Sequence, residues 1–155
     1  HVDKIKKHYP DITAQAADAR DLPFEDKSFD VVYSNAVIEH VGAFEDQQRM
    51  AREIMRVGRN WFVTTPNRWY PFEFHLRLPL VTWLPGELCW RAAQIVHYNH
   101  VRQRYAFFTG KPTGIRLLGA RQLASLFPDS HVIKQCVTLI FPETLIAVGG
   151  NDRER

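Results

Sequence analysis

The chain has 155 residues, of which 45% are hydrophobic and 24% are charged, and its formal net charge is +3. This length and hydrophobic content suit one folded domain with a packed core and exclude a disordered tail. The mild positive charge permits an anionic acceptor or a membrane surface and identifies neither. The two cysteines lack C-x-x-C spacing, so they support neither a disulfide framework nor a zinc site, and they suit a reducing compartment.

The chain carries no sign of a membrane span or an export signal. No run of about 18 or more apolar residues occurs, and the initial HVDKIKKHYP lacks a hydrophobic signal-peptide core. The sequence therefore predicts a soluble, cytoplasmic protein. Its first residue is His1 rather than Met, which favours a piece of a longer protein.

The first half of the chain alternates between short strand and helix patterns. Residues 2–8 predict the end of a helix, and residues 12–16 predict a short strand. Residues 29–34 carry consecutive apolar residues, the pattern of a strand buried on both faces of a parallel sheet. An amphipathic pattern at residues 44–57 predicts a crossover helix ending at a left-handed Gly58.

A strand at residues 61–65 would complete a βαβ unit with the preceding strand and helix, and such a unit has a right-handed crossover. Residues 119–127 predict another helix. Two β-rich runs follow at residues 131–141 and 143–148, separated only by Pro142. Such a short connection requires antiparallel pairing, so the sequence predicts a terminal antiparallel hairpin.

Four short motifs occur together between residues 18 and 41. They are Asp18-Ala19, Leu22-Pro23-Phe24, the segment SFDVV at residues 28–32, and Glu39-His40-Val41. As a set they resemble the class I S-adenosylmethionine-dependent methyltransferases, specifically the type 11, small-molecule branch that includes the ubiquinone and menaquinone biosynthesis enzymes. Each motif alone is weak.

The resemblance implies an α/β, Rossmann-like methyltransferase sheet with strand order 3-2-1-4-5-7-6. The family's glycine-rich turn is absent here, so residues 1–155 are expected to be the C-terminal portion of such a domain, lacking the first two strands. Those strands would lie between the strand near Asp18 and the strand near Ser34. Without them, we expect exposed apolar edges and weak cofactor binding, unless another chain fills the gap.

The resemblance also implies S-adenosylmethionine as the cofactor and assigns residues to its adenine end. Asp18 would accept a hydrogen bond from the adenine amine, and the Ala19 amide would meet a ring nitrogen. Leu22 and Phe24 would line the adenine. The alternatives are an Asp18 that caps the loop after a strand and apolar side chains that belong to the core.

Ser34 and Asn35 fall where the strand would open toward the reacting methyl group. In the nucleic-acid amino-methylating enzymes of the superfamily, this position carries Asn or Asp followed by Pro-Pro and an aromatic residue. Here the sequence is Ser-Asn-Ala-Val, so no nucleic-acid partner is expected.

Two histidines are candidate catalytic bases, because a neutral imidazole is available near neutral pH. His40 belongs to the Glu-His pair of the resemblance. His75 lies near Glu73, on the same side if the segment forms a strand. The alternatives are a His40 that bonds the backbone and a partly exposed loop histidine at position 75. No metal is expected, since His97 and His100 lack a third ligand.

Residues 67–113 form an expected insertion rich in aromatic side chains and arginines. Insertions at the carboxyl edge of such a sheet lie over the ligand crevice, which predicts a cap on the acceptor side. Contact with nucleic acid, a membrane interface or an apolar acceptor would all use this composition. A lid over a small apolar or amphipathic acceptor is favoured.

These observations favour methyl transfer to a small-molecule acceptor such as a quinone, lipid or glycolipid precursor. The alternative is a truncated or degenerate methyltransferase-like module without activity that binds a protein or membrane partner. A nicotinamide-dependent enzyme on a related fold fits less well with the terminal hairpin and the Asp18 motif.

Overall fold

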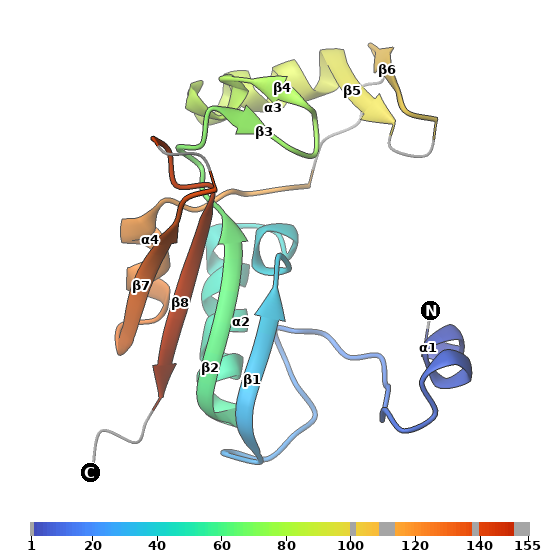
Figure 1. Ribbon diagram of the computed structural model, residues 1–155, viewed down its shortest axis with the longest axis vertical. Coiled ribbons are helices and arrows are strands. Elements are labelled where there is room, and N and C mark those ends of the chain that lie inside the picture. The colour runs from blue at the N-terminus through green and yellow to red at the C-terminus, as the bar shows by residue number, and fades with distance from the viewer. Residues whose placement is uncertain (1, 100–101, 109–113, 138–139, 151–155) are drawn as a thin grey trace.

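A computed structural model describes residues 2–99, 102–108, 114–137 and 140–150. A four-stranded sheet carries two helices on one face, and a group of short elements lies beyond one end of the strands (Figure 1). In chain order the elements are α1 (Val2–His8), β1 (Phe29–Asn35), η1 (Ile38–His40), α2 (Phe44–Val57), β2 (Gly58–Pro66), β3 (Phe72–Glu73), β4 (Leu78–Pro79), η2 (Val81–Trp83), α3 (Gly86–Ile95), β5 (Val96–Asn99), β6 (Arg104–Phe107), α4 (Ala120–Leu126), β7 (Ser130–Gln135) and β8 (Thr144–Gly150).

The sheet has strand order β1-β2-β8-β7. β1 and β2 are parallel, β8 is antiparallel to β2, and β7 is antiparallel to β8. Since α2 connects the two parallel strands, the predicted βαβ unit is confirmed, as is the terminal antiparallel hairpin. The order matches strands 4-5-7-6 of the expected sheet, so the α/β, Rossmann-like expectation is confirmed.

The crossover helix α2 has the predicted bounds because its apolar residues follow helical spacing. Met50, Ile54 and Val57 are buried on its inner face. The predicted left-handed Gly58 is wrong, because this residue is extended, with φ −95° and ψ 142°. Its lack of a side chain serves close packing instead, since a Cβ there would lie 2.7 Å from Cγ2 of Val32.

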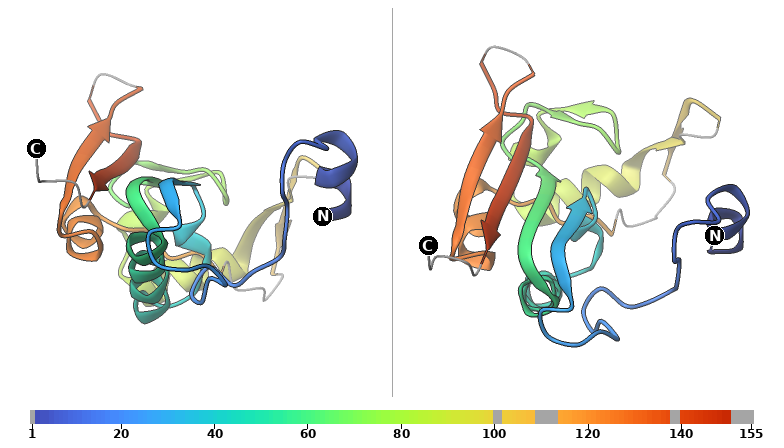
Figure 2. Two further views of the ribbon diagram at one scale, coloured as in Figure 1. Left: turned by 90° about the horizontal axis from the view of Figure 1, so that it is seen from below. Right: turned by 60° about the horizontal axis from the view of Figure 1, so that its bottom comes forward.

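The main core lies between the sheet and the helices α2 and α4, which cover the same face (Figure 2, left). Trp61 and Val63 on β2 are 1% and 0% exposed, and they alternate with residues of the other face. Phe127, at the end of α4, is fully buried, and its ring centroid lies 6.5 Å from that of Trp61. The core thus joins β2, β8, α2 and α4 into one unit.

The opposite face of the sheet and its β1 edge are open. Phe29, Val31 and Tyr33 are 39%, 60% and 65% exposed. The predicted burial of this strand on both faces is therefore wrong, because α2 and α4 cover only the face that carries Val32 and Trp61. The expected exposure of an apolar edge is confirmed.

The predicted strand at residues 12–16 is wrong, because this segment has no regular structure and Asp18 forms only an isolated bridge to Asp21. A strand needs a neighbour to pair its backbone groups, and the segment lies away from β1 (Figure 1). The predicted helix at residues 2–8 is confirmed as α1. None of its described residues is buried, and it stands apart from the sheet in Figures 1 and 2.

At the far end, the predicted helix at residues 119–127 is confirmed as α4, with Gly119 and Phe127 as its caps. The predicted run at residues 131–141 is too long, because β7 ends at Gln135. β8 begins at Thr144, directly opposite Gln135, so residues 136–137 and 140–143 belong to neither strand. The connection therefore spans residues 136–143 rather than Pro142 alone.

The expected insertion contains two short hairpins, β3-β4 and β5-β6, together with η2 and α3. These elements lie beyond the carboxyl ends of β1 and β2 (Figure 1). Leu76 and Val81 form a small core of their own. Residues 100–101 and 109–113, including His100, lie outside the described residues. Among the helices that the structure describes, none has the length and apolar character needed to cross a bilayer.

Candidate active site

The turn after β1 sets the position of the first predicted catalytic residue. β1 ends at Asn35, and Ala36 then has a left-handed φ of 51°. The Ala36 amide donates a hydrogen bond to the Thr64 carbonyl, with a 3.1 Å separation. This turn directs the chain into η1, which places Ile38 in the core and carries Glu39 and His40 at the carboxyl end of the parallel strands.

Glu39 is a fully buried carboxylate, with 0% exposure. Its Oε2 accepts a hydrogen bond from Oγ1 of Thr65 at 3.0 Å. Its Oε1 has no hydrogen-bond partner in the described part of the chain and lies 3.9 Å from Nε2 of His40. Since a buried carboxylate oxygen is costly to leave unpaired, this atom marks a place where a ligand would be stabilised.

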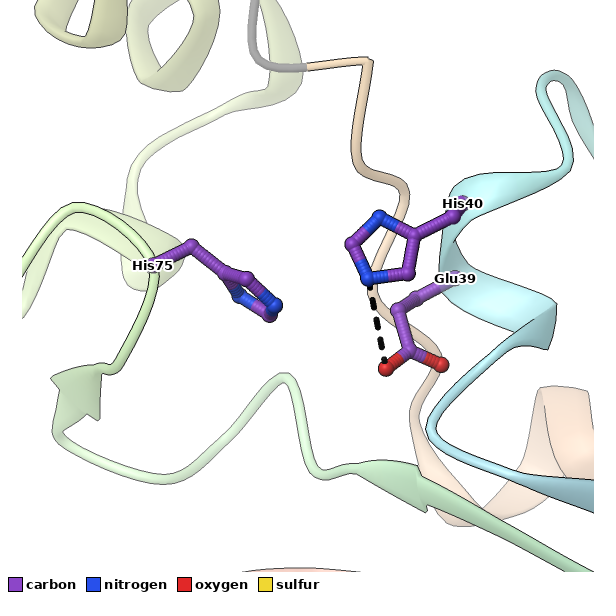
Figure 3. A group of neighbouring side chains, drawn as sticks. All are labelled: Glu39, His40 and His75. Carbon is purple, nitrogen blue, oxygen red and sulfur yellow. Dashed lines mark ion pairs between the residues drawn. The ribbon is translucent and has the colours of Figure 1, made fainter. Parts of the chain in front are cut away.

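The structure brings the two predicted catalytic histidines together. His40 comes from η1, and His75 comes from the turn after β3. Their ring centroids are 5.1 Å apart with an interplanar angle of 83°, and Figure 3 shows both rings directed toward the space beside Glu39. The side chain of His40 is 46% exposed and that of His75 is 30% exposed, so the site is accessible from solvent.

Glu73 orients His75. Nδ1 of His75 lies 2.7 Å from Oε1 of Glu73, and the Leu76 amide donates to Oε2 of the same carboxylate. The hydrogen bond to Glu73 raises the pKa of His75 above its ordinary value, against the effect of burial. Burial raises the pKa of Glu73, but the hydrogen bonds from His75 and Leu76 outweigh it and leave that pKa below its ordinary value.

The predicted proximity of Glu73 and His75 is therefore seen, although its reason differs. β3 contains only Phe72–Glu73, so the two side chains meet across a turn and not along a strand. Glu39 was not among the predicted site residues. The sequence feature that could have identified Glu39 is its position directly before His40, just after the end of β1.

Ser34 and Asn35 are the last two residues of β1. Ser34 is 8% exposed, and its Oγ has no hydrogen-bond partner in the described residues. Oδ1 of Asn35 accepts a hydrogen bond from Oγ1 of Thr64 at 2.6 Å. Both residues thus lie at the carboxyl end of the sheet, where a ligand crevice forms in open α/β folds.

Asp18 is linked to the first turn of α2 through Arg20. The Arg20 guanidinium contacts Asp18 at 2.8 Å and Asp46, in the first turn of α2, at 2.9 Å. The hydrogen bonds from Arg20 hold the pKa of Asp18 at about 2. Ala19 packs against the main core. The carboxylate of Asp18 is therefore ionised at neutral pH, and both of its oxygens accept hydrogen bonds from Arg20.

Leu22 and Phe24 lie near the end of β1 opposite to Ser34 and Asn35. The Leu22 amide donates to Oε2 of Glu53, in the last turns of α2, at 2.7 Å. The ring of Phe24 lies 4.9 Å from that of Phe29, at the start of β1. The structure thus places these two side chains toward the amino end of β1, whereas Ser34 and Asn35 lie at its carboxyl end.

We expect Glu53→Gln to loosen the turn at residues 22–24 and to lower the free energy of unfolding by about 1–2 kcal/mol at neutral pH. Glu53 accepts hydrogen bonds from Leu22 and from Arg56, whose guanidinium also contacts the Leu22 and Phe24 carbonyls. The variant would lose the charge-assisted part of these bonds. Urea unfolding at several pH values measures the effect.

The pH dependence follows from the pKa of Glu53, which the hydrogen bond from Arg56 holds below its ordinary value of 4.5. The contribution of Glu53 is complete above that ordinary value and is lost as pH falls through the lower, folded-state pKa. The difference between wild type and variant should therefore shrink in acid. Glu25→Gln, in the same loop but exposed, is the control, and an equal effect of both variants would contradict the prediction.

Comparison with known proteins agrees with this architecture. Residues 2–60 match the family model described as a methyltransferase domain. A probable S-adenosylmethionine-dependent methyltransferase of Mycobacterium tuberculosis is 40% identical over 67 residues, which are 41% of this chain and 23% of that protein. This chain thus matches about a quarter of the length of that relative.

Solved structures show the same fold. A protein from Pyrococcus horikoshii OT3 superposes with a TM-score of 0.55 at 19% identity, over 96% of this chain and 63% of that one. A methyltransferase from Methanosarcina mazei, described as S-adenosylmethionine-dependent, gives a TM-score of 0.50 at 14% identity, over 88% and 65%. The expected resemblance to class I S-adenosylmethionine-dependent methyltransferases is confirmed, and its ubiquinone and menaquinone branch stays a prediction.

Proposed function

We propose that the protein containing this chain transfers a methyl group from S-adenosylmethionine to a small-molecule acceptor. The observation that carries this proposal is the methyltransferase domain match over residues 2–60, which includes Asp18, Ala19 and the strand ending at Asn35. Asp18 and Ala19 would bind the adenine end of the cofactor, whereas Leu22 and Phe24, which lie toward the amino end of β1, are not assigned to this site. Ser34 and Asn35 would border the reacting methyl group.

Methyl transfer needs the acceptor atom held in line with the sulfonium and, where that atom carries a proton, a base. His40 and His75 support an acceptor position at the carboxyl end of the sheet. A neutral imidazole of either residue would accept the proton of an acceptor hydroxyl. Glu73 positions His75 through its Nδ1, which directs the other ring nitrogen to the acceptor.

The acceptor is proposed to be apolar or amphipathic, such as a quinone, a lipid or a glycolipid precursor. Several aromatic side chains of the segment at residues 67–113 remain at the surface. Trp69, Phe107 and Phe108 are 57%, 63% and 82% exposed. Exposed aromatic residues beyond the carboxyl ends of β1 and β2 suit an apolar acceptor and a peripheral contact with a membrane.

Calorimetric titration with S-adenosylhomocysteine tests the cofactor assignment. It compares this chain with a version extended upstream by about 60–80 residues, the length that two strands and their helices need. We expect binding to the extended protein and much weaker binding to this chain, because β1 lacks a neighbour on one side. In the extended protein, Asp18→Ala should abolish most of the binding.

Asp30→Ala is the matched control, since its side chain is 96% exposed at the start of β1. It should leave the affinity unchanged. Failure of both proteins to bind, or equal affinity in Asp18→Ala and wild type, would contradict the proposal.

A second candidate function, a partner-binding module without activity, is favoured by one observation. The β1 edge exposes Phe29, Val31 and Tyr33, together with backbone groups that a partner strand would pair. If neither protein binds S-adenosylhomocysteine, this edge becomes the leading site to examine.

A further inference from the structure

We infer that Glu39, His40 and His75 form a binding site for one divalent transition-metal ion. One potential ligand atom from each residue lies within 4.8 Å of those of the other two. The three side chains come from two separate segments, η1 and the turn after β3, and they converge on one space (Figure 3). This inference goes beyond the proposed methyl transfer, because metal binding is measured without cofactor or acceptor.

The burial of the Glu39 carboxylate is a second observation that favours a bound cation, in addition to the closeness of the three side chains. Glu39 is fully buried, and its Oε1 has no hydrogen-bond partner among the described residues. This oxygen also lies 3.9 Å from Nε2 of His40. A bound cation would neutralise the buried charge and occupy the unpaired oxygen, which no neighbouring donor does.

A second carboxylate, Glu73, is not one of the three ligands but forms a hydrogen bond with one of them, His75. Metal-binding histidines commonly donate their other ring N–H to a carboxylate, which fixes the ring and its tautomer. His75 makes this bond through Nδ1, at 2.7 Å from Glu73. Ligation would therefore use its Nε2. The other oxygen of Glu73 accepts from the Leu76 amide, so this carboxylate is itself held in place.

The donor set selects the class of ion. Two imidazoles and one carboxylate suit Zn²⁺, Co²⁺ or Fe²⁺, whereas Mg²⁺ and Ca²⁺ prefer oxygen ligands alone. Ligands about 2.1 Å from one tetrahedral ion lie about 3.4 Å apart. The 3.9 Å separation of Glu39 and His40, and the widest separation of at most 4.8 Å, would therefore both close by side-chain movement when the ion binds.

Three protein ligands leave positions open for water or an acceptor oxygen, as in catalytic metal sites. An ion there would lower the pKa of a bound hydroxyl and orient it. A liganded imidazole does not also accept a proton. The metal-bound and metal-free forms would therefore activate an acceptor in different ways, the first through the ion and the second through His40 or His75.

Titration of the chain with Co²⁺, followed by visible absorption and by equilibrium dialysis, tests the inference. We expect one tightly bound ion per chain, displaced by Zn²⁺. Glu39→Gln, His40→Ala and His75→Ala should each weaken binding at least tenfold. Glu73→Gln, which acts through His75, should weaken it by about 10–100-fold.

Glu39→Gln is expected to remain folded, since its amide oxygen can still accept a hydrogen bond from Thr65. Circular dichroism checks the folding of each variant. His131→Ala is the matched control, because His131 is exposed on β7 at the opposite edge of the sheet. Unchanged affinity in the folded variants of Glu39, His40 and His75, or no tightly bound ion in the wild type, would overturn the inference. Neither result would bear on S-adenosylhomocysteine binding, so the proposed function is tested separately.

Discussion

Trp61→Ala should lower the free energy of unfolding by about 3–5 kcal/mol. Trp61 is 1% exposed at the centre of the sheet, it packs against Phe127, and its Nε1 donates to Oγ of Ser130 at 2.6 Å. Truncation would leave a cavity between β2 and α4 and an unpaired hydroxyl. Because domains of this size are stable by only about 5–15 kcal/mol, the loss would remove much of the total.

Urea unfolding followed by circular dichroism measures this effect. Phe108→Ala removes another aromatic ring, one that is 82% exposed, and should change stability by less than about 0.5 kcal/mol. A small effect of Trp61→Ala, similar to that of the control, would contradict the placement of the core between β2 and α4.

The second large effect is expected for Gln47→Leu. Gln47 is fully buried, and its Nε2 donates to the carbonyls of Ile38 and Arg116 at 3.0 and 2.8 Å. Its Oε1 accepts from the Arg116 guanidinium at 2.8 Å. Leucine fills a similar volume but leaves two carbonyls without this donor, so we expect a loss of about 2–4 kcal/mol in unfolding free energy.

This substitution should also disturb the candidate site. Gln47 ties α2 to η1, which carries Glu39 and His40, and the Arg116 amide donates to the Glu39 carbonyl at 2.8 Å. Gln48→Leu, one residue further along α2 but exposed, is the control and should change stability little. Equal effects of the two variants in urea unfolding would contradict the role of Gln47.

The regular α/β core was predictable because its signals are local. The apolar residues of α2 follow the helical period, and those of β2 occur in one short run, so both elements form where the pattern places them. The terminal hairpin followed from the turn between two β-rich runs. Its length was wrong because β7 can extend only as far as β8 offers a partner.

The errors concern neighbours that local sequence does not specify. Residues 12–16 have the composition of a strand, yet they remain irregular because no strand lies beside them. Val31 and Tyr33 have the composition of a strand covered on both faces, yet one face is open. Gly58 was expected to end a helix by its left-handed conformation, whereas close approach of Val32 is what excludes a side chain there.

For the candidate site, the sequence supplied the residue types and the tertiary structure supplied their association. His40 and His75 were identified separately, and no spacing rule linked them. Their 5.1 Å ring separation results from the return of the segment after β2 over the carboxyl end of the sheet. The burial of Glu39 likewise depends on residues remote in the chain, such as Thr65, whose hydroxyl donates to Oε2 of the carboxylate.

The sequence by itself determined the class of fold, the βαβ unit, the terminal hairpin and the resemblance to methyltransferases, because periodicity and short motifs are properties of neighbouring residues. Only the tertiary structure decided which apolar residues are covered and which strands find partners. It also brought Glu39, His40 and His75 to one place with an unpaired carboxylate oxygen. Burial and convergence depend on segments far apart in the chain, whose packing no local pattern encodes.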